Sequence, residues 1–299
     1  MTTYEVPTDF SALHGRTILI TGCATGIGRE AAKLAYANGA NLALADVNEK
    51  ESQTLLSELN DDSRIVWRRV DVSDWDSFRD IFDAAIAKFG VIHAVLSNAG
   101  IHHEDLLGEQ FDAKGSLKAP DTSTININLI SQLYATKLAF HYFKKGPPTA
   151  GPRQIVYTGA ASAFIDTPLY QYSASKGGIL GLFKAFRPTA PKANVSINMV
   201  APWMTETNMT PPLISATWGD LPRNSAAGVA KALLLPVIRP EIHGKSLWVG
   251  GNEIVDFEDK LQETQPLWMG AKLSADVEEG QRRMMGLATN PLDAMAGKH

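Results

Sequence analysis

The sequence predicts an α/β fold: a single doubly wound parallel sheet of about seven strands, with helices on both faces. Two observations lead to this prediction. Apolar runs of strand length alternate with amphipathic stretches of helix length, and strands joined by helical crossovers pair in parallel. In addition, the runs ILI, LALA, AVL and INMV are apolar without alternation, as in strands that are buried on both faces.

Each expected strand is a short apolar run that ends near a polar, glycine or proline residue. In chain order, the expected strands are Thr17–Ile20, Leu42–Ala45, Ile65–Arg69, Ala94–Ser97, Gln154–Thr158, Val195–Val200 and Ser246–Val249. The stretches between them have apolar residues at helical spacing. These expected helices are Gly26–Asn38, Glu49–Leu59, Asp74–Phe89, Asp121–Lys145, Ser173–Phe186 and Ala226–Leu235.

Local signals predict where several of these elements begin and end. Asp74 and Asp121 are suited to the N-cap or the first turn of a helix. Pro188 lacks an amide donor and ends the helix that begins at Ser173. The glycines and prolines within Lys144–Pro152 predict a surface turn before the fifth strand.

Length and composition fit one globular domain over residues 1–299, with a core at about 15–251 and a C-terminal tail at about 252–299. We expect this tail to pack on its own subunit or on a neighbour. The net charge of −4 gives no basic footprint for nucleic acid or for an anionic membrane. The single cysteine, Cys23, excludes an internal disulfide and is compatible with a reducing compartment. Neither a secretion signal nor a run of about 18 apolar residues occurs, so we expect a cytoplasmic protein.

The run TGCATGIG lies between the first expected strand and the first expected helix. Its glycines have the spacing G-x-x-x-G-x-G. We expect Gly22 to make the tight turn, Gly26 to admit a pyrophosphate and Gly28 to let the helix pack on the strand, as in a Rossmann-type dinucleotide site. The cofactor-binding residues expected here are Gly22, Thr25, Gly26, Ile27 and Gly28. The alternative is a glycine-rich turn without a ligand.

Asp46 ends the second expected strand, eighteen residues after Gly28. A carboxylate at this place accepts hydrogen bonds from the ribose hydroxyls of the adenosine half, and it repels the extra phosphate of NADP. The next residue is Val47, and no basic residue occurs before Lys50. The sequence therefore favours NAD as the cofactor. A solvated helix N-cap is the alternative role for Asp46, and the two roles are compatible.

The run YSASK places Tyr172 and Lys176 four residues apart, on one face of a helix. An ammonium beside a phenol lowers the phenol's pKa, so that the phenol can exchange a proton near neutral pH. An ordinary amphipathic helix surface is the alternative for an isolated pair of this kind. Together with the glycine turn, the pair predicts hydride transfer with a tyrosine acid/base.

In their order and spacing, these motifs resemble the short-chain dehydrogenase/reductase superfamily, from about Gly15 to Gly251. The resemblance also rests on Asp71-Val72 after the third strand and on Asn98-Ala99-Gly100 after the fourth. It implies that Asp71 and Val72 hold the adenine, that Asn98 braces the central strand, and that Ala99 and Gly100 lie against the cofactor. The asparagine of the family's proton relay corresponds to Asn128, in ININLI.

The resemblance implies the following catalytic roles. Tyr172 gives its proton to the carbonyl oxygen in reduction and removes the alcohol proton in oxidation. Lys176 binds the nicotinamide ribose and lowers the pKa of Tyr172. Family members form dimers or tetramers through two long helices, here Asp121–Lys145 and Ser173–Phe186, so a homo-oligomer is expected.

The chain departs from the family pattern at two places. The family serine that holds the substrate oxygen falls on Gly159 or Ala160, and neither residue has a hydroxyl. Ser162 or Thr158 could replace it, with Ser162 favoured because it lies beyond the strand end; the alternative for Ser162 is a plain loop hydroxyl. Loss of such a hydrogen bond weakens the chemistry without excluding it.

The second departure is VAPWMTET, where Trp203 stands at the family glycine. Thr205 and Thr207 still align with the segment that holds the nicotinamide carboxamide. Trp203 either fills the pocket wall or touches substrate. We interpret His102 and His103 as loop residues, and no metal site is expected.

Methionine and tryptophan in the loops beyond the strand ends favour a moderately large, apolar small-molecule substrate. The sequence therefore predicts an NAD-dependent oxidoreductase that acts on a secondary alcohol or ketone. Two alternatives remain. One is a related enzyme that uses bound cofactor for a cyclisation or isomerisation, because the serine is lost. The other is a non-catalytic NAD-binding protein.

Overall fold

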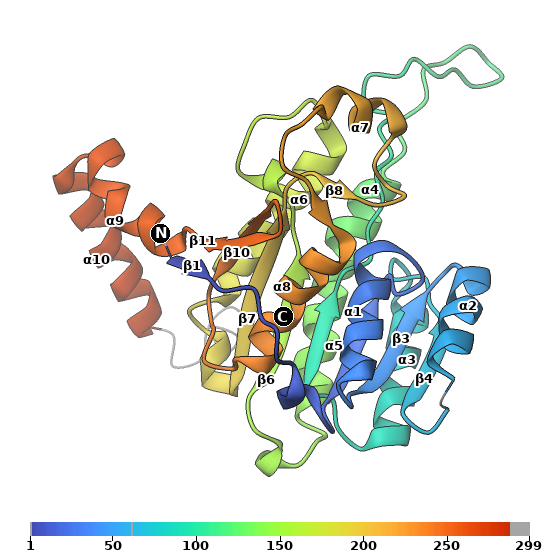
Figure 1. Cartoon of the computed structure of the whole chain (residues 1–299). Coiled ribbons are helices and arrows are strands. Elements are labelled where there is room, and N and C mark those ends of the chain that lie inside the picture. The colour runs from blue at the N-terminus through green and yellow to red at the C-terminus, as the bar shows by residue number, and fades with distance from the viewer. Residues whose placement is uncertain (1, 61, 288–299) are drawn as a thin grey trace, which may run out of the picture.

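The structure, a computed structural model, describes residues 2–60 and 62–287. A nine-stranded sheet lies at its centre, in the order β1-β11-β10-β7-β6-β5-β2-β3-β4 (Figure 1). The strands of this sheet are β1 (Thr2–Tyr4), β2 (Thr17–Thr21), β3 (Asn41–Asp46), β4 (Ile65–Arg69), β5 (Ala94–Ser97), β6 (Arg153–Thr158), β7 (Val195–Pro202), β10 (Ser246–Gly250) and β11 (Glu253–Asp256). Two further short strands, β8 (Thr205–Glu206) and β9 (Asn224–Ser225), pair with each other in parallel.

The seven expected strands are all present, and they form the parallel part of the sheet from β4 to β10. Two more strands extend the sheet beyond the expected seven. β11 runs antiparallel to β10, and β1 pairs antiparallel with β11, with Thr3 opposite Val255. The sequence did not predict β1 because it is three residues long and largely polar, and its partner lies at the other end of the chain.

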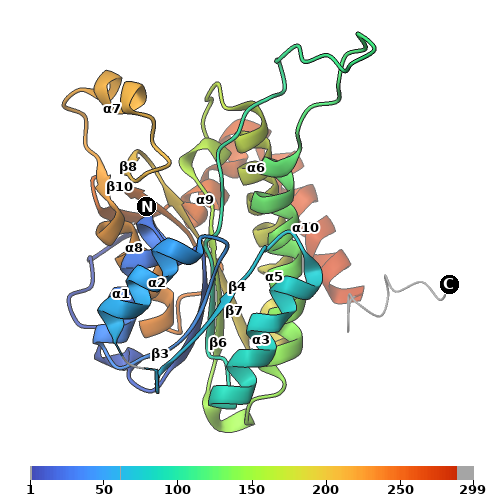
Figure 2. The same cartoon turned by 90° about the vertical axis from the view of Figure 1, so that its right-hand side faces the viewer.

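Helices cover both faces of the sheet (Figure 2). α1, α2 and α8 pack on one face, and α3, α5 and α6 pack on the other. In β2, Ile18 and Ile20 face the first core while Leu19 faces the second, which explains the apolar run without alternation. The helices are α1 (Gly26–Ala37), α2 (Glu49–Leu59), α3 (Trp75–Phe89), α4 (Ser123–Ile125), α5 (Ser131–Phe143), α6 (Tyr170–Phe186), α7 (Pro212–Trp218), α8 (Ala226–Ile238), α9 (Glu258–Met269) and α10 (Ala271–Leu287).

The expected helix Asp121–Lys145 is shorter and less regular than predicted. It begins at Ser123 and ends at Phe143, with a π-helical segment at Asn126–Ile130 between α4 and α5. Asp121 lies just before this helix, and its carboxylate accepts a hydrogen bond from the amide of Ser123. π-Helical segments are frequent at functional sites.

Two expected helix boundaries agree with the structure. Asp74 is the N-cap of α3, and its side chain accepts a hydrogen bond from the amide of Ser77. α6 ends at Phe186, shortly before Pro188. Capping and proline chemistry therefore predict these ends correctly.

The C-terminal tail forms two helices, α9 and α10, that lie against each other near the β1–β11 edge of the sheet (Figure 1). Arg187 and Ser246 fix the start of α9, because both contact the carboxylate of Glu258. Trp268 and Met284 are exposed in this single chain, so of the two expected places for the tail, its own subunit or a neighbour, its own subunit does not cover these two side chains. Residues 288–299 of the tail lie outside the described part of the chain.

Candidate active site

A cavity of about 470 Å³ opens where the parallel strands β2 to β7 end. All the expected site residues line this cavity except Gly28 and Asn128. The expected residues that line it are Gly22, Thr25, Gly26, Ile27, Asp46, Asp71, Val72, Asn98, Ala99, Gly100, Ser162, Tyr172, Lys176, Trp203, Thr205 and Thr207. Ligands of doubly wound sheets bind at this edge.

The glycine turn allows the backbone segments at the cavity floor to approach closely. Gly22 has a φ of +68°, and an added Cβ there would lie 2.8 Å from the Cα of Ala99. A Cβ on Gly28 would overlap the carbonyl oxygen of Gly22. Thr25, the N-cap of α1, makes no side-chain capping hydrogen bond. The free amides at the start of α1 therefore fit a pyrophosphate group.

Asp46 ties the end of β3 to the glycine turn. Its Oδ2 accepts a hydrogen bond from the amide of Ala24, and its Oδ1 accepts one from the amide of Asn48, each at 2.9 Å. Asn48, not Asp46, is the N-cap of α2, so the alternative role considered for Asp46 is wrong. Cys23 lies in the same turn, fully buried; burial, and secondarily the charge of Asp46, raises the pKa of its thiol.

Asn98 joins three neighbouring strands behind the cavity. Its Nδ2 donates to the carbonyls of Thr21 and Gly22, at 3.1 and 3.3 Å. The hydroxyl of Thr158, at the end of β6, donates to its Oδ1 at 3.2 Å. The hydroxyl of Thr158 is therefore engaged in bracing the sheet and is not free for a substrate.

Tyr172 and Lys176 lie one turn apart on α6 and face the cavity. The Nζ of Lys176 donates to the carbonyl of Thr158 at 2.8 Å and lies 5.4 Å from the centre of the Tyr172 ring. Burial lowers the pKa of Lys176 to about 8 and raises the pKa of Tyr172 to about 12. In the chain alone, loss of water controls the phenol pKa, so the expected lowering by Lys176 does not appear.

Asn128 lies in the π-helical segment and positions the loop after β5. Its Oδ1 accepts from the amide of Ile101, and its Nδ2 donates to the carbonyl of Ile101 and to the hydroxyl of Ser175. An added Cβ at Gly100 would lie 3.2 Å from this Oδ1. The side chain of Asn128 therefore supports the cavity wall from behind.

A sequence model of the short chain dehydrogenase family matches residues 16–217. The chain belongs to this family. The short-chain dehydrogenase/reductase prx4 of Penicillium roqueforti is 31% identical over 287 residues, which cover 88% of this chain and 82% of that protein. The 5'-hydroxyaverantin dehydrogenase of Dothistroma septosporum is 28% identical, over 89% of this chain and 93% of that protein.

The fold is also that of solved family members. A short chain dehydrogenase from Burkholderia cenocepacia, solved in complex with NADP, has a TM-score of 0.67 and 24% identity, and the match covers 80% of this chain and 98% of that one. Short-chain dehydrogenases are oxidoreductases that bind a nicotinamide cofactor, and this chain is one of them.

In this short-chain dehydrogenase, the position of the family serine is packed against the flexible side chain of Met199. A Cβ added at Gly159 would lie 2.8 Å from the Sδ of Met199. Ser162 lies three residues further on, in the 3₁₀ turn Ala161–Ala163. Its Oγ is buried at the cavity and has no hydrogen-bond partner within the described chain. This hydroxyl is therefore available to donate a hydrogen bond to an oxygen atom in the cavity.

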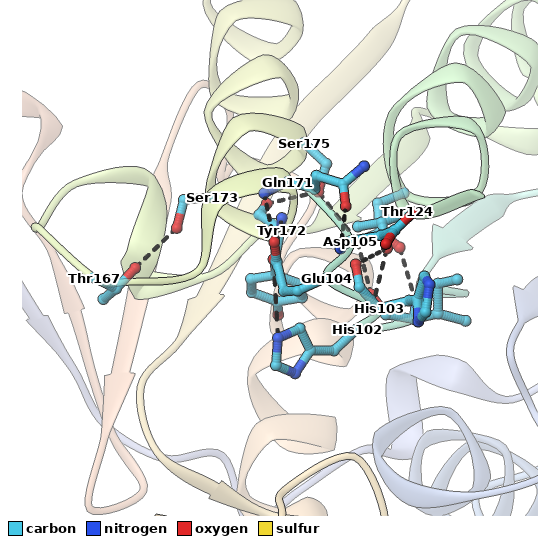
Figure 3. Close-up of polar contacts among 12 residues, drawn as sticks. His102, His103, Glu104, Asp105, Thr124, Thr167, Gln171, Tyr172, Ser173 and Ser175 are labelled. Atoms are coloured by element: carbon cyan, nitrogen blue, oxygen red, sulfur yellow. Dashed lines mark hydrogen bonds and ion pairs between the residues drawn. The ribbon is translucent and has the colours of Figure 1, made fainter. Parts of the chain in front are cut away.

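The loop after β5 binds the start of α6 beside Tyr172 (Figure 3). The two carboxylate oxygens of Glu104 accept hydrogen bonds from the amides of Tyr172 and Gln171, both at 2.9 Å. The amide of Asp105 donates to Gln171 Oε1, and the ring of His102 lies edge-on to that of Tyr172. Sequence reasoning missed Glu104 and Gln171, because no spacing in the sequence indicates that these distant segments meet.

Trp203 belongs to an aromatic cluster at the cavity mouth. Its ring stacks on Trp248, with centroids 5.7 Å apart, and meets Trp218 of α7 edge-on at 5.1 Å. Trp203 thus fills the wall and holds α7 near the cavity.

Within residues 2–60 and 62–287, no helix combines the length and hydrophobicity needed to span a bilayer. The same part of the chain holds no group of three His, Cys, Asp or Glu side chains arranged for a metal ion.

Proposed function

We propose that this short-chain dehydrogenase transfers a hydride between NAD(H) and a moderately large, apolar secondary alcohol or ketone. One observation carries the proposal: Tyr172 and Lys176 open into the same cavity as the glycine turn and Asp46. A tyrosine and a lysine beside a dinucleotide site place a proton donor where the hydride is exchanged. A protein that only binds NAD has no need of this pair.

The donor set of the cavity fits a dinucleotide. The open amides of α1 would hold the pyrophosphate, Asp46 the adenosine ribose, and Lys176 the nicotinamide ribose. The remaining cofactor contacts are proposed for Asp71, Val72, Asn98, Ala99, Gly100, Thr205 and Thr207, all of which line the cavity.

The charges of the cavity favour NAD over NADP. Lys176 is the only lysine or arginine among the described residues that line it. Next to Asp46 stands Val47, which is 51% exposed and has no charge to attract a 2′-phosphate. Each oxygen of Asp46 accepts one backbone hydrogen bond and keeps a lone pair for a ribose hydroxyl.

In this proposal the nicotinamide, when bound, supplies or accepts the hydride. Tyr172, with its pKa raised to about 12, is protonated at neutral pH and donates its proton to the substrate oxygen in reduction. In oxidation the phenolate takes the alcohol proton, so Tyr172 must first lose its own proton to solvent. Ser162 holds the same oxygen in place of the missing serine, because its buried hydroxyl has no other partner in the described chain.

The substrate half of the cavity is largely apolar, with Ile101, Met204, Met209 and Ile214 in its wall. Such a lining fits a sizeable apolar ligand with few polar groups. One relative is named as a dehydrogenase of a hydroxylated compound, 5'-hydroxyaverantin, which agrees in kind with this class. A cyclisation or isomerisation on bound cofactor is the second candidate, favoured only by the absence of a hydroxyl at Gly159.

A Tyr172→Phe variant separates these candidates. We expect it to lose turnover of ketones with NADH, followed at 340 nm, while NADH binding stays close to that of the native protein, because only the proton donor is removed. Ser162→Ala should lower kcat by about tenfold or more, because it removes a hydrogen bond to the oxygen on which charge develops. Near-native activity in Tyr172→Phe would show that the phenol is not the proton donor.

A substitution at Asp46 tests the proposed preference for NAD over NADP. In titrations of cofactor fluorescence, NADH should bind at least tenfold more tightly than NADPH, because the carboxylate attracts ribose hydroxyls and repels the 2′-phosphate. Asp46→Ala should reduce this preference. Equal affinities in the native protein would contradict the assignment of NAD.

A further inference from the structure

The helix that carries Tyr172 has no cap of its own at its N-terminus. α6 begins at Tyr170, its N-cap residue Leu169 makes no side-chain capping hydrogen bond, and its first turn contains no acidic residue. The first backbone hydrogen bond at this end runs from the amide of Ser173 to the carbonyl of Leu169. The amides of Gln171 and Tyr172 therefore need partners from outside the helix.

Glu104, in the loop after β5, supplies these partners. Its Oε2 accepts a hydrogen bond from the amide of Gln171 and its Oε1 accepts one from the amide of Tyr172, both at 2.9 Å (Figure 3). A carboxylate at a helix N-terminus also interacts favourably with the positive end of the helix dipole. Among the described residues, no lysine or arginine pairs with this carboxylate, and only the imidazole of His102 approaches it, at 3.9 Å. The start of α6 is therefore the main partner of Glu104.

The same loop holds the start of α6 at a second point. The Oε1 of Gln171 accepts a hydrogen bond from the amide of Asp105, and its Nε2 donates to the carbonyl of Asp121. These bonds fix the side chain of Gln171. The amide of Tyr172 has Glu104 as its only hydrogen-bond partner in the described chain. The backbone of Tyr172 therefore depends on Glu104 at this end of the helix.

Glu104 acts on the cavity only through Tyr172. Tyr172 lines the cavity, whereas Glu104 is absent from its lining. A substitution at Glu104 can thus move the proton donor without removing a group that touches substrate or cofactor. Proton transfer requires the donor to lie within hydrogen-bond distance of its acceptor. A displacement of the phenol by about 1 Å therefore lowers the rate about 10²-fold.

We propose that Glu104 is a positioning residue for proton transfer: through the amides of Gln171 and Tyr172, its carboxylate holds the phenol of Tyr172 where the substrate oxygen binds. This inference rests on the proposed function, since it concerns the proton donor of the same site. Loss of the carboxylate should slow the chemical step and leave the binding of cofactor and ketone nearly unchanged.

Single-turnover reduction of acetophenone by NADH, followed at 340 nm, measures the chemical step. For Glu104→Ala we expect a rate about 10²-fold below that of the native protein, counted per NADH-binding site. The Kd for NADH and the half-saturating ketone concentration should stay within about threefold of the native values. Glu104→Gln keeps one acceptor oxygen, so its rate should lie between the two, and it carries the test if the alanine variant does not fold. A native rate per site in the folded variants would overturn the proposal.

Asp83→Ala is the matched control. The carboxylate of Asp83, on α3, also joins two elements, because its Oδ1 accepts a hydrogen bond from the hydroxyl of Tyr142, on α5, at 2.6 Å. Neither residue lines the cavity. We expect a lower midpoint of thermal unfolding but an unchanged single-turnover rate. An equal fall of the rate in Asp83→Ala and Glu104→Ala would show that general destabilisation slows the reaction, and it would overturn the proposal.

Hydrogen–deuterium exchange separates this inference from the proposed function. In Glu104→Ala the amides of Gln171 and Tyr172 should exchange faster, with the change confined to the start of α6. Unchanged exchange would overturn the proposal. If exchange is faster but the native protein does not reduce acetophenone, hydride transfer to this ketone is contradicted and the fixing of Tyr172 by Glu104 stands. If reduction depends on Tyr172 but not on Glu104, the proposed function stands and the role of Glu104 fails.

Discussion

Tyr172 and Lys176 show how burial acts in opposite directions on two neighbouring side chains. Both lose water, so each favours its neutral form: the pKa of the phenol rises to about 12 and that of the amine falls to about 8. The phenol keeps its proton at neutral pH and is ready to donate it. The amine remains close to its titration range, held by the carbonyl of Thr158.

The lowered pKa of Lys176 makes stability depend on pH. Between pH 8 and 10.5 the amine of Lys176 binds more protons in the unfolded chain than in the folded chain. The contribution of Lys176 to the free energy of unfolding therefore rises with pH through this window. Relative to Lys176→Met, the native protein should gain up to about 3 kcal/mol from pH 8 to pH 10.5 in urea unfolding. Lys184→Met, on the exposed part of α6, is the control. A difference that does not change with pH would contradict the lowered pKa.

At the scale of elements, the contact between α1 and β2 depends on the lack of a side chain at Gly28. Gly28→Ala would press a Cβ into the carbonyl oxygen of Gly22 and force α1 away from the strand. We expect a loss of more than about 2 kcal/mol in the free energy of unfolding, together with much weaker NADH binding.

Gly181→Ala is the matched control for this change. Gly181 is also helical, in α6, and an added Cβ there meets nothing within 4 Å. Its unfolding free energy should stay the same or rise by up to about 1 kcal/mol, because alanine favours helix. Equal effects of the two substitutions would show that α1 and β2 do not need the close approach.

The sequence predicted the helices and strands whose formation depends on their own residues. The apolar runs of β2, β3, β5 and β7 indicate burial on both faces wherever the rest of the chain lies. β1 and β11 are different, because each is a strand only through its partner. The residues of the π-helical segment at Asn126–Ile130 likewise do not distinguish it from an ordinary α-helix.

The residues of the candidate site also fall into two groups: those that the sequence predicts and those that only packing reveals. Gly22 and Asp46 could be placed at the cavity from motif and strand order alone. The contact of Glu104 with the start of α6 joins segments 67 residues apart, and only packing reveals it. The sequence already favoured Ser162 over Thr158 as the replacement for the family serine, and packing adds that Asn98 engages the hydroxyl of Thr158 while that of Ser162 has no partner in the described chain.

On the scale of the whole molecule, the apolar surface of the tail indicates assembly. α9 and α10 expose the large apolar side chains of Leu267, Trp268 and Met284 in the single chain, and exposed apolar surface of this kind marks an interaction site where it is contiguous. We therefore expect a symmetric homo-oligomer, a dimer or tetramer. Light scattering at micromolar concentration measures its mass, and the mass of a single chain would contradict this expectation.

The position of Cys23 has a kinetic consequence. It is the only cysteine of the chain, it is fully buried, and its raised pKa keeps it as the unreactive thiol. An alkylating reagent can reach it only when the glycine turn opens, so the labelling rate in the native protein measures how often this turn opens. A dinucleotide that binds the closed turn slows labelling in proportion to its occupancy. The rate at which Cys23 reacts therefore reports cofactor binding in the native sequence, without a substitution to introduce a cysteine.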